Sequence, residues 1–321
     1  MAVEISAIVC TRNRAGFLKK CLHGLLQQTL DPERYEVIVV DNGSTDTTQE
    51  VLKGFSDNPL VKVILEPVPG LSRARNRGLE EARAPFVGYI DDDAVPGEKW
   101  LESALHAFTS CQPQPDWVGG PVTLEWEVAR PSWINDELSA PLGWVHWGDV
   151  PRALSEQEWL IGANSCFKKE TLFRCGGFDE RLGRKGPCLL SGEETQIKKK
   201  IEASGGYLYY HPLVTVRHFV PAERVQPGWY YRRYFWGGVT DRLMRATVSR
   251  GEGVSSGVAT QGDSSLSAKL GRVLENFINA CGFVASEEKT IRGRIYVAYV
   301  LGWCYGLVRW PIVGGCDEQT S

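Results

Sequence analysis

The sequence predicts an α/β fold with a mostly parallel central sheet and a helical carboxyl-terminal region. Apolar runs of strand length alternate with segments of helical periodicity through the first third of the chain. Short polar or acidic motifs follow several of those runs. Alternation of this kind builds right-handed βαβ units, and open sheets bind their ligands at the carboxyl ends of the strands. These ends are therefore the places to look for a site.

The expected elements follow in order. Residues 3–10 and 35–40 are strand-like, and apolar residues at three-four spacing predict a helix between them. The elements expected next are a helix from 44 or 45 to 53, a strand at 61–65, a helix at 72–82, a strand ending at 91 and a helix at 100–110. The pattern predicts a parallel sheet with crossover helices.

Consecutive aspartates end the strand that stops at residue 91. An apolar run is followed by Asp91, Asp92 and Asp93, and then by Pro96. Adjacent carboxylates repel one another unless a cation neutralises them, and hard oxygen ligands suit Mg²⁺ or Mn²⁺. We expect a divalent-metal site that bridges to the phosphates of a substrate. An acidic turn in solvent is the alternative if the triplet is taken alone.

Composition and missing motifs exclude several classes of protein. The 36 basic and 39 acidic residues nearly balance, so nucleic acid is not an expected partner. The sequence has no phosphate-binding P-loop, no dinucleotide fingerprint and no histidine-cysteine cluster suited to zinc. Nine cysteines without a C-x-x-C pair, and an amino terminus without a signal peptide, predict a cytoplasmic protein.

Tryptophans are concentrated in the loop-rich stretch after residue 110. They are Trp117, Trp126, Trp133, Trp144, Trp147 and Trp159. Such residues can form the core of an irregular region, or a platform on which sugar rings stack, because an indole offers a large apolar face. Both interpretations can hold for different tryptophans.

The carboxyl-terminal region mixes basic and aromatic residues. Residues 217–250 suit either an anionic membrane surface or an interdomain seam, and the Gly/Ser-rich residues 250–268 predict a flexible linker. The apolar run Ile295–Val308 has about 14 residues, fewer than the roughly 20 that cross a bilayer. It predicts a packed or interfacial helix. Peripheral contact with the inner face of the cell membrane and homo-oligomerisation both remain open.

Other strand ends complete a predicted pocket. Thr11 and Asp41 end the first two strands, so parallel pairing would bring them to the same sheet edge as the acidic triplet. Arg75 lies between two further arginines at the start of the helix at 72–82. Acids that can accept hydrogen bonds from a nucleobase or ribose, an arginine and a metal-binding cluster together predict a pocket for a nucleoside diphosphate. For the flanking Arg73 and Arg77 we expect a solvated helix face.

Seven motifs occur in the order typical of a known family, and the chain resembles the inverting glycosyltransferases of family 2, with the GT-A fold. The motifs are Ile8–Arg14, Val39–Asp46, Gly70–Gly78, Tyr89–Asp93, Gly162–Asn164, Gly176–Glu180 and Gly192–Thr195. The resemblance covers about residues 3–220. It implies a Rossmann-like nucleotide-diphospho-sugar transferase domain at 1–220, with a donor half at 1–110 and an acceptor half at 111–220. Residues 221–321 would form a helical appendage.

The resemblance also implies roles for individual residues. The nucleotide sugar would be bound by Thr11, Asn13, Arg14, Asp41, Arg75, Asp91, Asp92 and Asn164. Asp41 would contact the nucleobase, Arg75 the base or the diphosphate, and Asp92 the ribose. Asp91 and Asp93 would hold Mn²⁺ or Mg²⁺. His218 follows a predicted strand and would be either a further metal ligand or an ordinary core histidine.

The catalytic base would come from a carboxylate pair that opens a helix. Here the pair is Glu193-Glu194, whereas the family usually has aspartate in the second position. Successive helical residues point about 100° apart, so only one glutamate would face the acceptor squarely. By its position in the motif we expect Glu194 to be the base, with Glu193 as the alternative. The additional methylene requires the side chain to fold back or the acceptor to sit slightly further out.

These observations predict a metal-dependent inverting glycosyltransferase. The donor would be a UDP-, GDP- or dTDP-sugar, and the acceptor a hydroxyl of a glycan, a lipid-linked saccharide or a small molecule. One alternative is a non-catalytic nucleotide- or glycan-binding module that retains the fold. A sugar nucleotidyltransferase is another, although its glycine-rich loop after the first strand is missing.

Overall fold

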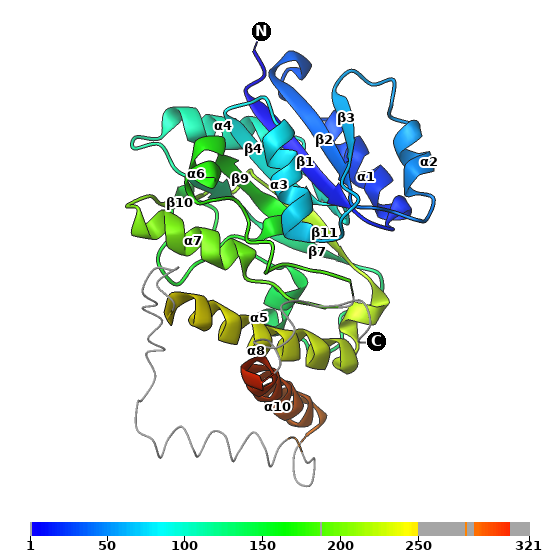
Figure 1. The fold of residues 1–321 in the computed structure, drawn as a ribbon, viewed down its shortest axis with the longest axis vertical. Coiled ribbons are helices and arrows are strands. Elements are labelled where there is room, and N and C mark those ends of the chain that lie inside the picture. Colours follow the sequence, from blue (N-terminus) through cyan, green and yellow to red (C-terminus); the bar gives the residue numbers. More distant parts are fainter. Residues whose placement is uncertain (1, 187, 250–279, 281–285, 309–321) are drawn as a thin grey trace. The chain divides into compact units, whose positions relative to one another are not determined.

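The computed structural model describes residues 2–186, 188–249, 280 and 286–308 (Figure 1). The chain divides into two compact units. The first contains Met1–Glu127, Asp136–Gly183 and Glu193–Val220, and the second contains Val128–Asn135, Arg184–Gly192 and Pro221–Ser321. The assignment of 1–110 to the donor and 111–220 to the acceptor stays a prediction.

The first unit contains the strands and the shorter helices. Its strands are β1 Ile5–Thr11, β2 Tyr35–Asp41, β3 Val61–Leu65, β4 Phe86–Asp91, β5 Ala94–Pro96, β6 Trp117–Gly119, β7 Val122–Trp126, β8 Arg152–Ala153, β9 Ser165–Lys168, β10 Leu208–Tyr210 and β11 Val216–Val220. Its helices are α1 Ala15–Leu26, α2 Thr48–Lys53, α3 Leu71–Glu81, α4 Trp100–Ser110, α5 Asp136–Ser139, α6 Lys169–Arg174 and α7 Glu193–Ala203. Short 3₁₀ turns are η1 Pro32–Arg34, η2 Ala140–Leu142 and η3 Gly162–Asn164.

The strands form an eight-stranded sheet in the order β3-β2-β1-β4-β9-β6-β10-β8 and a three-stranded sheet in the order β5-β11-β7. In the larger sheet β1 runs parallel to β2 and β4, β2 to β3 and β6 to β10, whereas β8 and β9 are antiparallel to their neighbours. The sheet is therefore mixed and mostly parallel, which confirms the predicted fold class.

The register of β1 explains how the predicted pocket residues meet. Thr11 pairs with Asp41 on one side of β1, and Cys10 pairs with Asp91 on the other side. The carboxyl ends of β1, β2 and β4 therefore lie at one edge of the sheet. The predicted juxtaposition of Thr11, Asp41 and the acidic triplet is confirmed.

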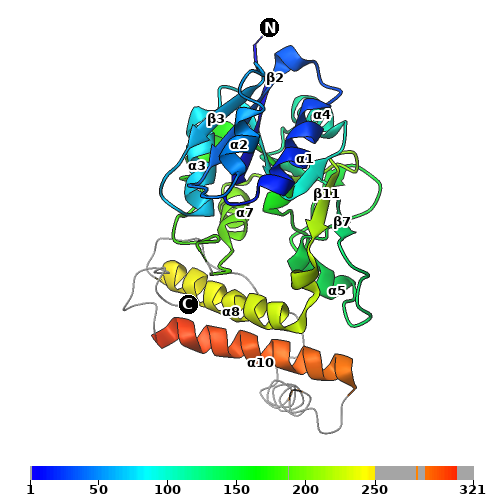
Figure 2. The ribbon, with the colours of Figure 1, turned by 90° about the vertical axis from the view of Figure 1, so that its right-hand side faces the viewer.

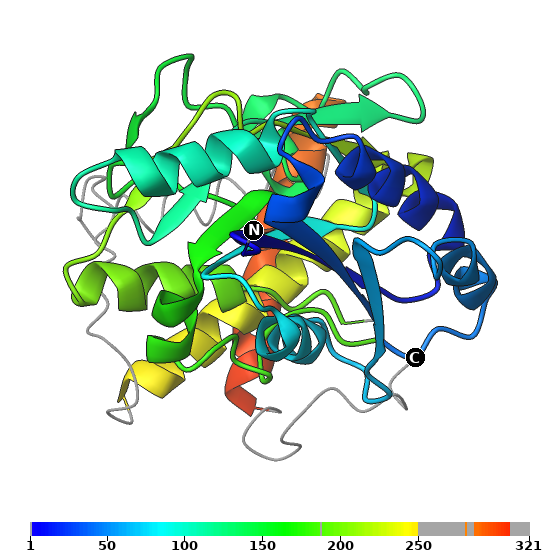
Figure 3. The same ribbon diagram turned by 90° about the horizontal axis from the view of Figure 1, so that it is seen from above.

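Helices cover both faces of the larger sheet (Figure 3). Leu22 of α1 and Trp100 of α4 belong to the core on one face. Leu79 of α3, Leu172 of α6 and Ile197 of α7 belong to the core on the other. The apolar periodicity that predicted these helices thus marks the sides that they bury against the sheet.

The predicted β3 and α4 match the structure residue for residue, whereas α2 begins later than expected. It begins at Thr48 and not at residue 44 or 45. Side chains hold the preceding turn open: Asp41 Oδ1 accepts a hydrogen bond of 2.9 Å from the Ser44 amide. Asn13 Oδ1 accepts one of 2.7 Å from the Thr45 amide, and Asp46 Oδ1 accepts one of 3.0 Å from the Thr48 amide. These bonds replace a first helical turn.

The tryptophans divide between the two interpretations. Trp117 is 1% exposed and packs against Phe167 with ring centroids 4.6 Å apart, so it belongs to the core. Trp159 is 40% exposed, and its ring meets that of Trp147 nearly at right angles with centroids 4.7 Å apart. A sugar platform stays a prediction for Trp159.

The second unit contains η4 Ala222–Val225, α8 Pro227–Ser249 and α10 Glu287–Val308. Helices α8 and α10 lie side by side (Figure 2), and glycines permit this approach because a Cβ at Gly238 or Gly302 would collide with the backbone of the other helix. Phe235 and Trp236 pack against Leu190, Val239 and Leu243, so part of the aromatic segment forms a helix seam.

The predicted helix Ile295–Val308 is the second half of α10. The predicted linker 250–268 lies outside the described residues. Within the described part of the chain, no helix is long and apolar enough to span a membrane. The cysteine pattern predicts a cytoplasmic protein, in which disulfides are rare, yet Cys188 is disulfide-bonded.

Candidate active site

The acidic triplet lies where β4 ends, and its side chains have three sets of partners. Asp91 faces Arg75, at 3.5 Å between Oδ1 and Nη2. Asp92 accepts a hydrogen bond of 2.7 Å from the Thr11 hydroxyl, and Asp93 lies 3.1 Å from Nε2 of His218. Asp92 and Asp93 are buried, whereas the Asp91 side chain is 36% exposed. The triplet therefore belongs to a built site and is not a solvated turn.

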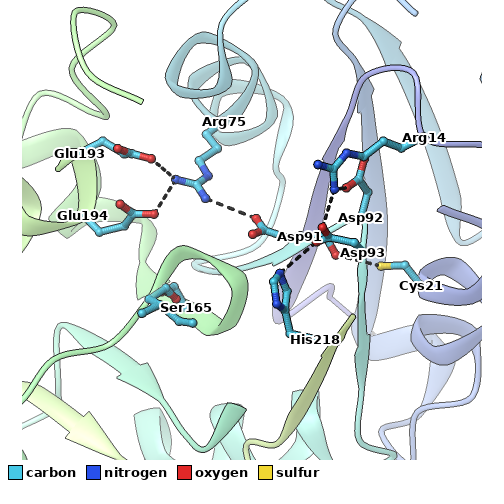
Figure 4. A network of polar contacts seen from close by, with 11 residues as sticks. Arg14, Cys21, Arg75, Asp91, Asp92, Asp93, Ser165, Glu193, Glu194 and His218 are labelled. Atoms are coloured by element: carbon cyan, nitrogen blue, oxygen red, sulfur yellow. Dashed lines mark hydrogen bonds and ion pairs between the residues drawn. The ribbon is translucent and has the colours of Figure 1, made fainter. Parts of the chain in front are cut away.

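Asp91, Asp93 and His218 form a group suited to a metal ion. One ligand atom of each lies within 4.8 Å of the others. His218 reaches the triplet because β11 pairs with β5, and the Phe219 amide donates a hydrogen bond of 2.9 Å to the Asp93 carbonyl oxygen. Two hard carboxylates beside an imidazole fit Mn²⁺ or Mg²⁺. Figure 4 shows His218 and Asp93 pointing toward one another.

Arg14 supplies a positive charge to the triplet. Its Nη1 lies 3.4 Å from Asp92 Oδ1 and contacts Asp93 Oδ2 (Figure 4). Burial raises the pKa of Asp92 to about 7, against the opposing charge of Arg14 and with the help of the Asp93 charge. Arg14 and Thr11, both predicted to bind the nucleotide sugar, thus orient the acids in this structure. Their nucleotide contacts stay predictions.

Three other predicted binding residues shape the backbone around the pocket. Asp41 is buried, and one of its oxygens holds the turn after β2. Asn13 has a left-handed φ of 56° and fastens that turn to the end of β1. Asn164 accepts a hydrogen bond of 2.8 Å from the Trp100 indole and donates one of 2.7 Å to the Val214 carbonyl oxygen. Asn164 therefore holds separate segments together, and its contact with a donor stays a prediction.

Arg75 of α3 joins the carboxylate pair to the metal group. Its Nη1 lies 3.1 Å from Glu193 Oε1 and 2.9 Å from Glu194 Oε1. Figure 4 shows its guanidinium between this pair and Asp91. Burial alone would lower the pKa of Arg75, but the charges of Glu194, Glu193 and Asp91 raise it above its ordinary value. The guanidinium is therefore a permanent buried cation.

The two glutamates occupy different environments. Glu193 is 3% exposed, and burial together with the Glu194 charge raises its pKa to about 8 although Arg75 opposes the shift. The Glu194 side chain is 20% exposed. When the environments of two neighbouring carboxyl groups give them different pKa values, the two groups are suited to different acid and base roles. Burial therefore favours the protonated form of Glu193 more than that of an ordinary glutamate, and Glu194 is the member of the pair open to a substrate.

Gly162 is a site residue whose role the sequence motif did not reveal. A Cβ at this position would collide with both Glu194 Oε1 and Arg75 Nη2. The glycine therefore leaves the space in which Glu194 and Arg75 meet. The only signal in the sequence is its place in Gly162–Asn164, which identifies a motif but not the neighbours of its first residue.

The buried Glu193 predicts a pH-dependent stability. Its folded-state pKa of about 8 lies above the ordinary value of 4.5. The folded protein then keeps a proton that the unfolded chain has lost, so the free energy of unfolding should fall by a few kcal/mol as pH rises from about 4.5 to about 8. Glu193→Gln, which mimics the protonated acid, should show a smaller fall.

Urea unfolding at about pH 5, 7 and 9 measures this difference. Glu170→Gln is the matched control because Glu170 is exposed on α6. Parallel pH profiles for the wild-type protein and Glu193→Gln would show that Glu193 is ionised in the folded state at neutral pH.

The site thus combines a mostly parallel sheet, an acid cluster at its edge and a carboxylate pair across from that cluster. Residues 6–176 match the profile described as "Glycosyl transferase family 2", and the chain belongs to that family. The resemblance seen in the motifs is thereby confirmed.

The names of two relatives agree with this assignment. The chain is 26% identical over 246 residues to "Glucosyl-dolichyl phosphate glucuronosyltransferase" of Haloferax volcanii, covering 75% of this chain and 77% of the relative. It is 26% identical over 224 residues to "Validoxylamine A glucosyltransferase" of Streptomyces hygroscopicus, covering 63% of this chain and 48% of the relative. The match therefore spans about half of the second relative.

The fold resembles that of "Mannosyltransferase PcManGT from Pyrobaculum calidifontis in complex with GDP-Man and Mn2+". The TM-score is 0.63 with 18% identity, over 96% of this chain and 88% of the other. It also resembles S. aureus TarS 1-349 in complex with UDP-GlcNAc, with a TM-score of 0.52 and 15% identity, over 94% and 89% of the two chains. At these identities the likeness concerns the fold.

Proposed function

We propose that the protein is a metal-dependent inverting glycosyltransferase that moves a hexosyl group from a nucleotide-diphosphate sugar to a hydroxyl group. The observation that carries this proposal is the placement of two acid groups around Arg75. A metal-suited group containing Asp91 lies at one of its nitrogens, and the Glu193-Glu194 pair lies at another. A donor and an acceptor could thus meet at one sheet edge.

The donor side would hold the diphosphate through a divalent ion. Asp91, Asp93 and His218 are the residues that would bind Mn²⁺ or Mg²⁺. When bound, such an ion neutralises the charge that develops on a departing diphosphate. The neighbour that contains GDP-Man and Mn²⁺ and the neighbour that contains UDP-GlcNAc support a nucleotide-sugar donor and do not decide its base.

Glu194 would act as the base on the acceptor side. It takes the proton of the acceptor hydroxyl as that oxygen forms a bond to the anomeric carbon, on the face opposite the diphosphate. The bond from that carbon to the diphosphate oxygen breaks, and the diphosphate leaves with the electron pair. One displacement inverts the configuration at the anomeric carbon. Of the two glutamates, Glu194 is the more exposed and is therefore the one that an acceptor hydroxyl could reach.

The acceptor we propose is a lipid-linked saccharide or a glycan. The name of the Haloferax volcanii relative refers to a lipid-linked substrate, which supports a lipid-linked saccharide as the acceptor. The exposed indole of Trp159 supports an acceptor with a sugar ring, since such rings stack on aromatic faces. Action in the cytoplasm, at the inner face of the cell membrane, would fit a lipid-linked acceptor and a peripheral role for the carboxyl-terminal helices.

A donor screen tests the proposed function. We expect one class of UDP-, GDP- or dTDP-sugar to raise the melting temperature in the presence of Mn²⁺, because a ligand that binds only the folded state stabilises it. A chelator should remove the effect. The same donor should be turned over slowly with water as acceptor, releasing a nucleoside diphosphate and a sugar of inverted anomeric configuration.

Other products would contradict the proposal. A retained configuration would exclude the single displacement, and pyrophosphate would indicate a nucleotidyltransferase. Stabilisation without any turnover, with water or with saccharide acceptors, would indicate a binding module that retains the fold.

A further inference from the structure

We propose that Arg75 is a positioning residue for the base, in place of the nucleotide contact expected from the sequence. It holds Glu194 at the acceptor side and links it to Asp91 at the donor side. This inference rests on the proposed function, in which Glu194 takes the acceptor proton. In this role Arg75 affects transfer only by positioning Glu194, and it need not contact the donor or the acceptor.

The contacts of the guanidinium carry the inference. Nη1 faces Glu194 at 2.9 Å and Glu193 at 3.1 Å, whereas Nη2 faces Asp91 at 3.5 Å. The Arg75 side chain is only 4% exposed, and these acids come from α7 and β4. Both terminal nitrogens of the guanidinium already face carboxylates, so few N–H donors are left to bind a nucleotide.

Neighbouring groups hold Arg75 in this orientation. The ring of Phe178 lies 5.4 Å from its guanidinium carbon, and the Tyr89 hydroxyl donates a hydrogen bond of 3.1 Å to its backbone carbonyl oxygen. Gly162 leaves the space in which Nη2 lies. A side chain that is packed and bonded in this way gives Glu194 a preorganised partner, and such preorganisation keeps a reacting group in productive geometry.

The shape of arginine matters for this task. A guanidinium is planar and presents separate N–H donors in a fixed fork, whereas a lysine ammonium is a single point charge. Arg75→Lys should therefore keep a positive charge near Glu194 but lose the simultaneous link to Asp91. The lysine variant should be intermediate between the wild-type protein and Arg75→Gln.

The main measurement separates turnover from donor binding. For Arg75→Gln we expect kcat to fall about 10- to 100-fold, since displacement of a catalytic group by about 1 Å has effects of this size. Binding of the nucleoside diphosphate with Mn²⁺, measured by calorimetry with the nucleotide found in the donor screen, should change less than about threefold. Arg77→Gln is the matched control, because Arg77 lies on the same helix and pairs with Glu81 at the surface.

A double variant distinguishes positioning from a general structural effect. If Arg75 acts through Glu194, Arg75→Gln combined with Glu194→Gln should be no slower than Glu194→Gln alone. Multiplied losses would overturn the inference. Arg75→Gln with wild-type kcat and weakened nucleotide binding would also overturn it, while leaving the glycosyltransferase assignment in place.

The failure of the proposed function has a different signature. In that case the wild-type protein itself would release pyrophosphate, retain the anomeric configuration or turn over no donor, whereas wild-type turnover by Glu194→Gln would remove only Glu194 from the role of base. Melting temperatures of all variants show whether they fold. Should Arg75→Gln fail to fold, Arg75→Lys carries the same comparison of kcat with nucleotide binding, and an unchanged kcat in that variant would contradict the inference.

Discussion

Glu194→Gln should abolish sugar transfer and leave nucleotide binding nearly intact. The substitution keeps the size of the side chain and its place beside Arg75, but an amide cannot accept the acceptor proton. General-base catalysis contributes about 10²- to 10⁴-fold, so we expect kcat to fall by a factor in this range. Glu194 is separate from the metal-suited group of Asp91, Asp93 and His218, and donor affinity should therefore stay close to that of the wild-type protein.

Steady-state transfer rates and calorimetric nucleotide binding measure the two quantities separately. Glu202→Gln serves as the control because Glu202 lies on the same helix, α7, with a side chain that is 40% exposed. Turnover at the wild-type rate in Glu194→Gln would remove Glu194 from the role of base and turn attention to Glu193.

Gly162→Ala should inactivate the protein without unfolding it. The added methyl group would collide with the carboxylate end of Glu194 and the guanidinium end of Arg75. Both are ends of side chains and not backbone, so the added methyl group can be accommodated by side-chain movement without a change of fold. That movement displaces the base, and a misplacement of about 1 Å can lower the rate about 10²-fold. We expect a loss of that size in a protein that still folds.

Gly16→Ala is the matched control, since a Cβ at Gly16 of α1 would meet no atom within 4 Å. It should retain full activity and be slightly more stable, because alanine favours helix more than glycine does. An active Gly162→Ala would indicate that Glu194 tolerates displacement. If circular dichroism showed that Gly162→Ala is unfolded, Gly162 would be required for the fold and not only for the site.

Local patterns were sufficient for β1, β2, β3 and β4 of the larger sheet. The apolar run before Asp91 and the three-four spacing around Leu22 depend only on neighbours in the sequence, and both predicted the elements that form. The start of α2 was predicted too early because Asn13 bonds the turn that precedes it, at residues 32 and 33 positions further along the chain. Side-chain competition of this kind is not visible in periodicity.

The sequence by itself determined the fold class and the sheet edge that carries the acids, because alternating strands and helices build a parallel sheet whose strands end at one edge. Only the tertiary structure decided which groups meet there. Arg75 reaches Glu194 across 119 positions of sequence, and the pairing of β11 with β5 brings His218 to Asp93. The two glutamates also differ in burial, because Glu193 is more deeply buried than Glu194. Contacts and burial depend on segments far apart in the chain, and no local pattern encodes them.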